Sequence, residues 1–168
     1  RPDRPNRRRG GTLLPCKAVS TWRGMSDIRH VTPTFAVAGQ LDPADFARLA
    51  AEGFTLAIKN RPEREDPGQP SDEIMREAAR AAGLAFHTLA FVGPPPPGVV
   101  AETADLLEGA TGPVIAYCRT GRRSIMAWAM AQALAGVRQP DEIIMLAARA
   151  GYDLEGARDA LTTLAPKP

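Results

Sequence analysis

Aromatic side chains, cysteines and long apolar runs are all scarce in this sequence. Only 5% of its 168 residues are aromatic, although 44% are hydrophobic, so a core must be built mainly from aliphatic side chains. The two cysteines, Cys16 and Cys118, cannot form a disulfide framework, and a reducing, cytoplasmic setting is the simpler expectation. No apolar run reaches the roughly 18 residues of a membrane-spanning helix, so we expect no membrane partner.

The sequence also lacks a large excess of charge of either sign. The formal net charge is only +2, which gives no basis for expecting nucleic-acid binding. The histidines, His30 and His87, and the carboxylates do not show metal-ligand spacing. We therefore expect neither a metal nor another cofactor. The sequence leaves the oligomeric state open.

The first 24 residues differ in composition from the rest. They are rich in Arg, Pro and Gly and show no periodicity, which is typical of a disordered basic extension. Met25, followed by Ser26 and Asp27, resembles a natural start, so we interpret the extension as lying upstream of the true start. An Arg-rich targeting segment and a basic tail for an acidic partner are the alternatives. Residues 25–168 are predicted to form a single domain.

From residue 35 onward, short apolar runs alternate with amphipathic stretches. Strands are expected at 35–38, 54–58, 84–90 and 114–117, and the last is apolar enough to lie in the middle of a sheet. Helices are expected from Asp42 to Gly53, from Ser71 to Gly83, and over 99–109, 124–135, 141–149 and 153–163. This alternation predicts an α/β fold with a central, mostly parallel, four-stranded sheet flanked by helices.

The chemically distinctive run is Cys-Arg-Thr-Gly-Arg-Arg-Ser at 118–124, directly after the apolar strand and before a helix. A loop between a strand and a helix N-terminus directs backbone N–H groups at one point, which suits a thiolate or a tetrahedral anion. Cys118 is therefore predicted to be a catalytic thiolate. Arg123, with its planar fork, is predicted to bind two oxygens of an anion. An ordinary buried cysteine is the alternative, but such a cysteine seldom heads a Gly-containing loop with two arginines.

The other residues of this loop are assigned supporting roles. Thr120 and Gly121 should contribute shape and backbone amides. Arg119 and Arg122 should enrich the pocket mouth in positive charge and favour a small anionic substrate or a phosphorylated protein, with ordinary surface charge as the alternative. Ser124 can hydrogen-bond the sulfur and ease its departure from a covalent intermediate.

Further runs carry a resemblance to a known family. They are Phe-Ala-Val-Ala-Gly-Gln at 35–40, Ile-Lys-Asn-Arg-Pro-Glu at 58–63, Asp-Pro-Gly-Gln-Pro at 66–70, Ala-Ala-Gly-Leu at 81–84, and 113–124 around the loop. Over about residues 27–150, the sequence resembles the phosphatase-like domain family also found at the front of beta-lactamase hydrolase-like proteins. The resemblance implies a fold similar to that of dual-specificity, tyrosine-phosphatase-like enzymes. It also implies Cys118 as the nucleophile and Arg123 as the anion-binding arginine.

Three features depart from ordinary tyrosine phosphatases. Their loop holds one residue more than the four between Cys118 and Arg123, and the shorter loop resembles that of rhodanese sulfurtransferases, whose cysteine carries a persulfide. Tyr117 stands where those phosphatases usually have His. They also take a general acid, Asp, from the loop that here runs from Gly93 to Gly98 and contains only Gly and Pro. Since protonating the leaving group is worth roughly 10²–10⁴-fold, the acid must come from elsewhere or the leaving group must not need one.

Three carboxylates, Glu63, Glu65 and Asp66, lie in the polar 60–70 loop, which the resemblance places near the rim of the site. One of them could act as the general acid, and solvated loop charges are the alternative.

Three functions follow from these residues. The first is a cysteine-dependent, phosphatase-like hydrolase that acts on a phosphomonoester through a phosphocysteine. The second is a rhodanese-like sulfurtransferase with a persulfide on Cys118, and the third is a non-catalytic anion- or phosphoprotein-binding module. The hydrolase comes first, because the resemblance covers more than a hundred residues whereas the loop differs by one.

Overall fold

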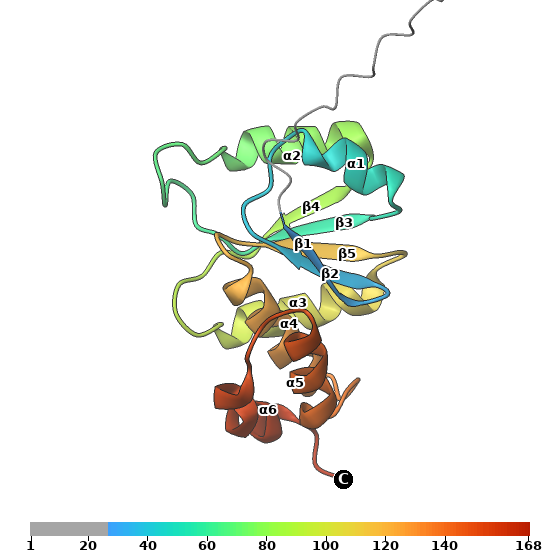
Figure 1. The fold of residues 1–168 in the computed structure, drawn as a ribbon, viewed down its shortest axis with the longest axis vertical. Coiled ribbons are helices and arrows are strands. Elements are labelled where there is room, and N and C mark those ends of the chain that lie inside the picture. The colour runs from blue at the N-terminus through green and yellow to red at the C-terminus, as the bar shows by residue number, and fades with distance from the viewer. Residues whose placement is uncertain (1–26) are drawn as a thin grey trace, which may run out of the picture.

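The computed structural model describes residues 27–168, so the predicted extension at 1–24, Cys16 and Met25 lie outside the described part of the chain. Within it, five strands form one sheet in the order β1-β2-β5-β3-β4 (Figure 1). The strands are β1 Ile28–Thr32, β2 Phe35–Ala38, β3 Leu56–Lys59, β4 Ala85–Thr88 and β5 Val114–Tyr117. β1 pairs antiparallel with β2, and all other pairs are parallel.

The predicted α/β fold with a mostly parallel sheet is confirmed, but the sheet has one more strand than the expected four. The additional strand, β1, has the sequence Ile-Arg-His-Val-Thr, and its second and third side chains are exposed. An edge strand with polar residues and one solvated face lacks the apolar run by which the other strands were found.

Helices cover both faces of the sheet. On one face lie α1 (Asp45–Ala51) and α2 (Asp72–Ala82), and on the other lie α3 (Pro97–Gly109) and α4 (Arg122–Leu134) (Figure 1). The C-terminal helices α5 (Pro140–Arg149) and α6 (Arg158–Leu164) pack against α4, with a short 3₁₀ turn, η1 (Glu155–Ala157), between them. Among the described residues, no helix is long and apolar enough to span a membrane.

Helix boundaries differ from the expected ones by a few residues. The first helix begins at Asp45 rather than Asp42, because a turn precedes it in which Asp45 N–H donates to Asp42 O at 2.9 Å. The helix after the cysteine loop begins at Arg122, two residues before the expected start. The expected helix at 153–163 is divided into η1 and α6.

Two apolar cores lie on the two faces of the central strands. Every residue of β2, β3 and β5 is buried, which agrees with the expectation that 114–117 lies centrally. On the α4 face, the rings of Phe35 and Trp128 stack with centroids 5.4 Å apart. On the α1 and α2 face, Phe46, Met75 and Tyr117 are fully buried. The sheet is therefore a rigid support for the loops at the carboxyl ends of its strands.

One charged side chain is buried inside this framework. Lys59, at the end of β3, is 0% exposed, and its Nζ donates to Asp72 and, at 3.0 Å, to Glu63 Oε1. Burial alone would raise the pKa of Asp72, but hydrogen bonds from Lys59 and Thr88 outweigh it, and the pKa lies below its ordinary value. The buried ammonium thus fixes the start of α2 to the end of β3.

Removal of the Asp72 carboxylate should destabilise the fold. Asp72→Ala leaves the Lys59 ammonium buried with one half-exposed partner, and we expect the free energy of unfolding to fall by about 3 kcal/mol. Urea denaturation followed by circular dichroism measures this. The matched control is Glu73→Ala, which removes an exposed carboxylate from the same helix turn. Equal losses for the two variants would show that the buried pair contributes nothing beyond helix-terminal charge.

Candidate active site

The loop after β5 surrounds the sulfur of Cys118. The backbone N–H of Cys118 continues the sheet by donating to Ala38 O at 3.3 Å, and the N–H of Gly121 turns back to donate to Cys118 Sγ at 3.1 Å. Gly121 has a φ of 89° and directly precedes α4, a conformation that favours glycine. The thiol is almost fully buried, since Cys118 is 1% exposed. The expected strand, loop and helix N-terminus are therefore all present, with one amide aimed at the sulfur.

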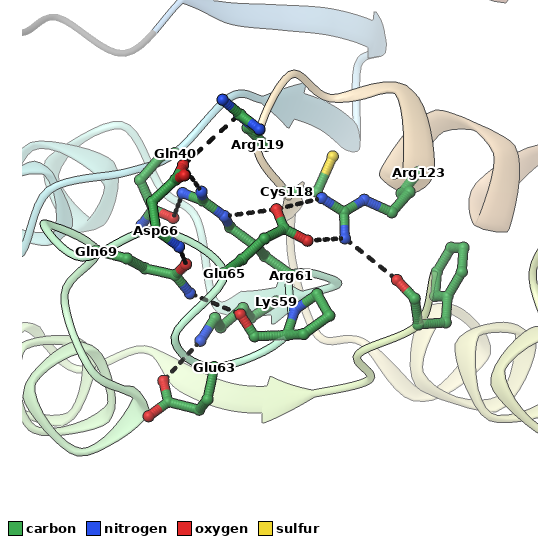
Figure 2. A network of polar contacts seen from close by, with 12 residues as sticks. Gln40, Lys59, Arg61, Glu63, Glu65, Asp66, Gln69, Cys118, Arg119 and Arg123 are labelled. Atoms are coloured by element: carbon green, nitrogen blue, oxygen red, sulfur yellow. Dashed lines mark hydrogen bonds and ion pairs between the residues drawn. The ribbon is translucent and has the colours of Figure 1, made fainter. Parts of the chain in front are cut away.

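The guanidinium of Arg123 is held beside this loop by two acceptors. Nη1 donates to Glu65 Oε2 at 2.9 Å and to Phe91 O at 3.2 Å, and Nη2 donates to Glu65 Oε1 at 2.8 Å (Figure 2). A guanidinium has five N–H groups, so these contacts leave the Nε–H and one Nη2–H, which lie on the same edge of the fork. Neither Glu65 nor Phe91 binds that edge, which has the geometry to donate to two oxygens of an anion.

Electrostatics connect Arg123 to Cys118 as well. The hydrogen bonds to Glu65 raise the pKa of Arg123 above its ordinary value, and the charge of Cys118 raises it further. The guanidinium and the sulfur are thus close enough for a thiolate and a permanent cation to stabilise each other.

Glu65 is the carboxylate that the structure places closest to this chemistry. Hydrogen bonds from Arg123 lower the pKa of Glu65 to about 2, and Arg61, whose Nε donates to Oε1 at 3.0 Å, adds to the effect. A carboxyl group with this pKa carries no proton near neutral pH. The predicted general-acid role therefore does not suit Glu65, which instead orients Arg123.

The other two carboxylates of the 60–70 loop are paired differently. Asp66 contacts Arg61, and its Oδ2 lies 3.6 Å from Nε of Arg119 (Figure 2). Glu63 binds Lys59 and accepts the N–H of Asp72 at 2.7 Å, and it points away from Cys118 (Figure 2). Of these three carboxylates, only Asp66 contacts an arginine of the cysteine loop, Arg119, without contacting Arg123.

Charges alternate along one chain of contacts, Arg123, Glu65, Arg61, Asp66 and Arg119 (Figure 2). Its central member, Arg61, has a side chain only 4% exposed. Because a buried guanidinium must be paired, Arg61 holds both carboxylates, and these hold the first and last arginines of the cysteine loop. No local sequence pattern indicates that Arg61 is a site residue. The only signal is that it lies in the run at 58–63, which carries part of the family resemblance.

Ser124 occupies a different position from the one expected. Its hydroxyl is buried and donates to Asn60 Oδ1 at 2.8 Å, and Asn60 Nδ2 donates to Leu89 O at 3.0 Å. A hydroxyl has one proton, so Ser124 does not donate to the sulfur here. It ties the start of α4 to the strand ends beneath the loop. Asn60, which accepts the hydrogen bond and so orients the Ser124 hydroxyl, is not a residue that the sequence pattern indicates.

Two tyrosines near the loop have contrasting positions. Tyr117 points into the core on the α1 and α2 side, where burial raises the pKa of its hydroxyl well above the ordinary value, and this hydroxyl has no hydrogen-bond partner among residues 27–168. Tyr152, from the segment between α5 and η1, donates to Thr120 O at 3.2 Å. Tyr152 was missed because its position depends on helices that pack from the far end of the chain. Within 27–168, no group of three or more His, Cys, Asp or Glu residues could hold a metal ion.

A cysteine in a loop between a central parallel strand and a helix, with an arginine beside it, is the arrangement of tyrosine-phosphatase-like α/β proteins. Residues 27–135 match the phosphatase-like domain of beta-lactamase hydrolase-like protein. The chain belongs to this family, and the expected resemblance is confirmed.

Relatives and solved structures agree with this assignment. The beta-lactamase hydrolase-like protein of Agrobacterium fabrum is 34% identical over an alignment of 131 residues that covers 74% of this chain and 29% of that protein. The chain thus spans less than a third of the length of that relative. A crystal structure from Neisseria meningitidis Z2491, named as a proposed phosphatase, is 33% identical, has a TM-score of 0.69, and covers 82% of this chain and 97% of its own.

More distant structures share the fold alone. The crystal structure of PTPMT1 in complex with PI(5)P has a TM-score of 0.65 at 18% identity, and the match covers 82% of this chain and 93% of that one. The fold and the family together are phosphatase-like.

The contribution of Glu65 to stability should depend on pH. Because the folded pKa is lowered from 4.5 to about 2, the ionised carboxylate stabilises the fold above pH 4.5, and this stabilisation is lost as the pH falls toward 2. Glu65→Gln should therefore be less stable than the wild type at pH 7 and equally stable near pH 2, as measured by thermal unfolding across pH. Glu77→Gln, which breaks an exposed pair with Arg80, is the control and should have little effect. A Glu65→Gln deficit that persists unchanged at pH 2 would contradict the ion-pair explanation.

Proposed function

We propose that this chain is a cysteine-dependent hydrolase of phosphomonoesters that acts through a phosphocysteine intermediate. One observation carries the proposal: Cys118 Sγ accepts the N–H of Gly121 beside Arg123, whose Nε–H and second Nη2–H are bound by neither Glu65 nor Phe91. The first contact favours a thiolate, and the second suits two oxygens of a phosphoryl group. The family and the 33%-identical structural neighbour, both phosphatase-like, support the same chemistry.

The reaction would proceed in two displacements. In the first, the Cys118 thiolate forms an S–P bond while the bond from phosphorus to the leaving oxygen breaks, and that oxygen takes up a proton. In the second, water attacks phosphorus, the S–P bond breaks, and orthophosphate leaves with the thiolate restored. The N–H groups of Arg123 and of the loop would stabilise the charge on the transferring phosphoryl oxygens in both steps.

A sulfurtransferase remains the competing function, and the loop length favours it. Only four residues separate Cys118 from Arg123, so the anion-binding loop at 118–123, which we call the cradle, is small. In it, the Gly121 amide could stabilise a persulfide as well as a thiolate. A binding module would use the same cradle without covalent chemistry.

A paired assay separates these functions. Purified protein should hydrolyse an aryl phosphate and should not transfer sulfur from a sulfane-sulfur donor to cyanide. Cys118→Ser should lose at least about 10³-fold in phosphatase turnover, since a serine hydroxyl is not ionised near neutral pH. Cys16→Ser is the matched control and should retain full activity. Sulfur transfer alone would overturn the phosphatase, and turnover of neither substrate would favour the binding module.

The first displacement also needs a general acid to protonate the leaving oxygen. We retain Asp66, because Glu65 is held ionised by Arg123 and Glu63 is turned away. The Asp66 side chain is 44% exposed and contacts Arg61 and Arg119 beside the cysteine loop, and we propose that it donates the proton to the leaving oxygen.

Leaving groups of different basicity test the role of Asp66. Asp66→Asn should lower kcat/KM for an alkyl phosphate by about 10²-fold, because an alkoxide must be protonated as it leaves. The same change should have little effect on 4-nitrophenyl phosphate, whose phenolate leaves unprotonated. The control is Asp105→Asn, an exposed carboxylate on α3. An equal loss with both substrates would show that Asp66 acts only by holding Arg61 and Arg119.

A further inference from the structure

A cavity of about 390 Å³ adjoins the cysteine loop. Its walls include Thr120 and Arg122 from the loop, Gln40 from the segment after β2, Arg29 from β1, and Tyr152 from the C-terminal segment. We call it the Tyr152 cavity. One carboxylate, Asp27, also lines it, whereas those of the 60–70 loop do not.

Tyr152 connects this cavity closely to the catalytic loop. Its hydroxyl donates to Thr120 O at 3.2 Å, and a Cβ added at Gly121 would lie 2.1 Å from the same oxygen. The N–H of Gly121 donates to Cys118 Sγ, so the wall of the cavity and the sulfur share one residue. Burial raises the pKa of Tyr152, and the charge of Cys118 raises it further. The cavity is therefore a short distance from the atom that would attack phosphorus.

The wall formed by Tyr152 is braced from behind. The guanidinium of Arg29 lies over the tyrosine ring, 5.6 Å from its centroid, and its Nη1 donates to Ala150 O at 3.0 Å. Arg29 also pairs with Asp27 at 2.9 Å. Arg29 thus has a carboxylate partner in the wall of the same cavity, and its guanidinium supports the tyrosine ring.

Arg122 supplies the uncompensated charge of the cavity. Of the three arginines in the loop, Arg119 has Asp66 and Arg123 has Glu65 as an ion-pair partner, whereas Arg122 has no carboxylate partner among residues 27–168. Its side chain is exposed and lines the cavity together with the polar groups of Gln40 and Thr120. An unpaired cation in a polar cavity next to a phosphate cradle fits a second anionic group.

We propose that the Tyr152 cavity is a subsite for a second anionic group on the leaving-group side of the substrate. The substrate class would then be phosphomonoesters that also carry a phosphate or a carboxylate, with Arg122 as the residue that selects them. This inference rests on the proposed phosphatase function, and it adds the reason why the loop carries an arginine at 122 that the cradle does not use.

Turnover of matched phosphates tests the proposal. With the three phenylene bisphosphates, which differ in spacing, we expect one isomer to exceed phenyl phosphate in kcat/KM by about 10-fold, mainly through KM. Two equivalent phosphates account for only about twofold of this, because either of them can enter the cradle. Arg122→Ala should reduce the preference to that statistical ratio, Arg122→Lys should restore most of it, and Arg149→Ala, an exposed arginine on α5, should leave it intact. Absence of a preferred isomer, or a preference that survives Arg122→Ala, overturns the subsite.

Protection of the thiol keeps this test independent of turnover. In a Cys16→Ser background, the preferred bisphosphate should protect Cys118 from alkylation at a concentration about 10-fold below that of phenyl phosphate, and Arg122→Ala should remove the difference. If no phosphate is hydrolysed but this difference is found, the proposed hydrolase fails while the subsite stands. Equal protection by the two compounds overturns the subsite.

Discussion

The ion pair between Arg123 and Glu65 is the interaction on which the geometry of the site depends. It is bidentate, with N–O distances of 2.8 and 2.9 Å, and it uses the end of the guanidinium fork that an anion would otherwise occupy. The arginine is thereby oriented, and Glu65 leaves the Nε–H edge of the guanidinium unbound. Glu65 is in turn held by the buried Arg61, so the cradle around Cys118 is anchored by a segment more than fifty residues upstream.

This arrangement separates the two sides of the cysteine loop. On one side, the 60–70 loop supplies carboxylates that neutralise Arg119 and Arg123 and leave only directed N–H groups for a substrate. On the other side, Arg122 faces a polar cavity without a carboxylate partner among residues 27–168. A phosphoryl group beside Cys118 would thus meet Arg123, which is oriented by its ion pair with Glu65. A second anion beside Tyr152 would meet Arg122, which is exposed and has no carboxylate partner among the described residues.

Sequence reasoning was most reliable where a pattern is local. The strand at 114–117, the cysteine after it and the following helix could be predicted because apolar periodicity and a glycine break are visible within a few residues. It was least reliable for roles that depend on partners. Glu65 was a candidate acid, yet hydrogen bonds from Arg123 lower its pKa and keep it ionised. Ser124 was expected at the sulfur, yet its hydroxyl donates to Asn60. β1 was missed because a half-solvated edge strand has no apolar run.

The sequence by itself determined the class of the fold and the family, and it predicted Cys118 and Arg123 as the central pair of the site. These depend on residue type and on short spacings, which the chain carries before it folds. Only the tertiary structure decided which charged side chains of the site pair with one another. The contacts of Arg123 with Glu65, and of Tyr152 with Thr120, join residues 58 and 32 positions apart. Such pairs form because the carboxyl ends of parallel strands meet at one edge and α5 packs against α4, and no local pattern encodes that convergence.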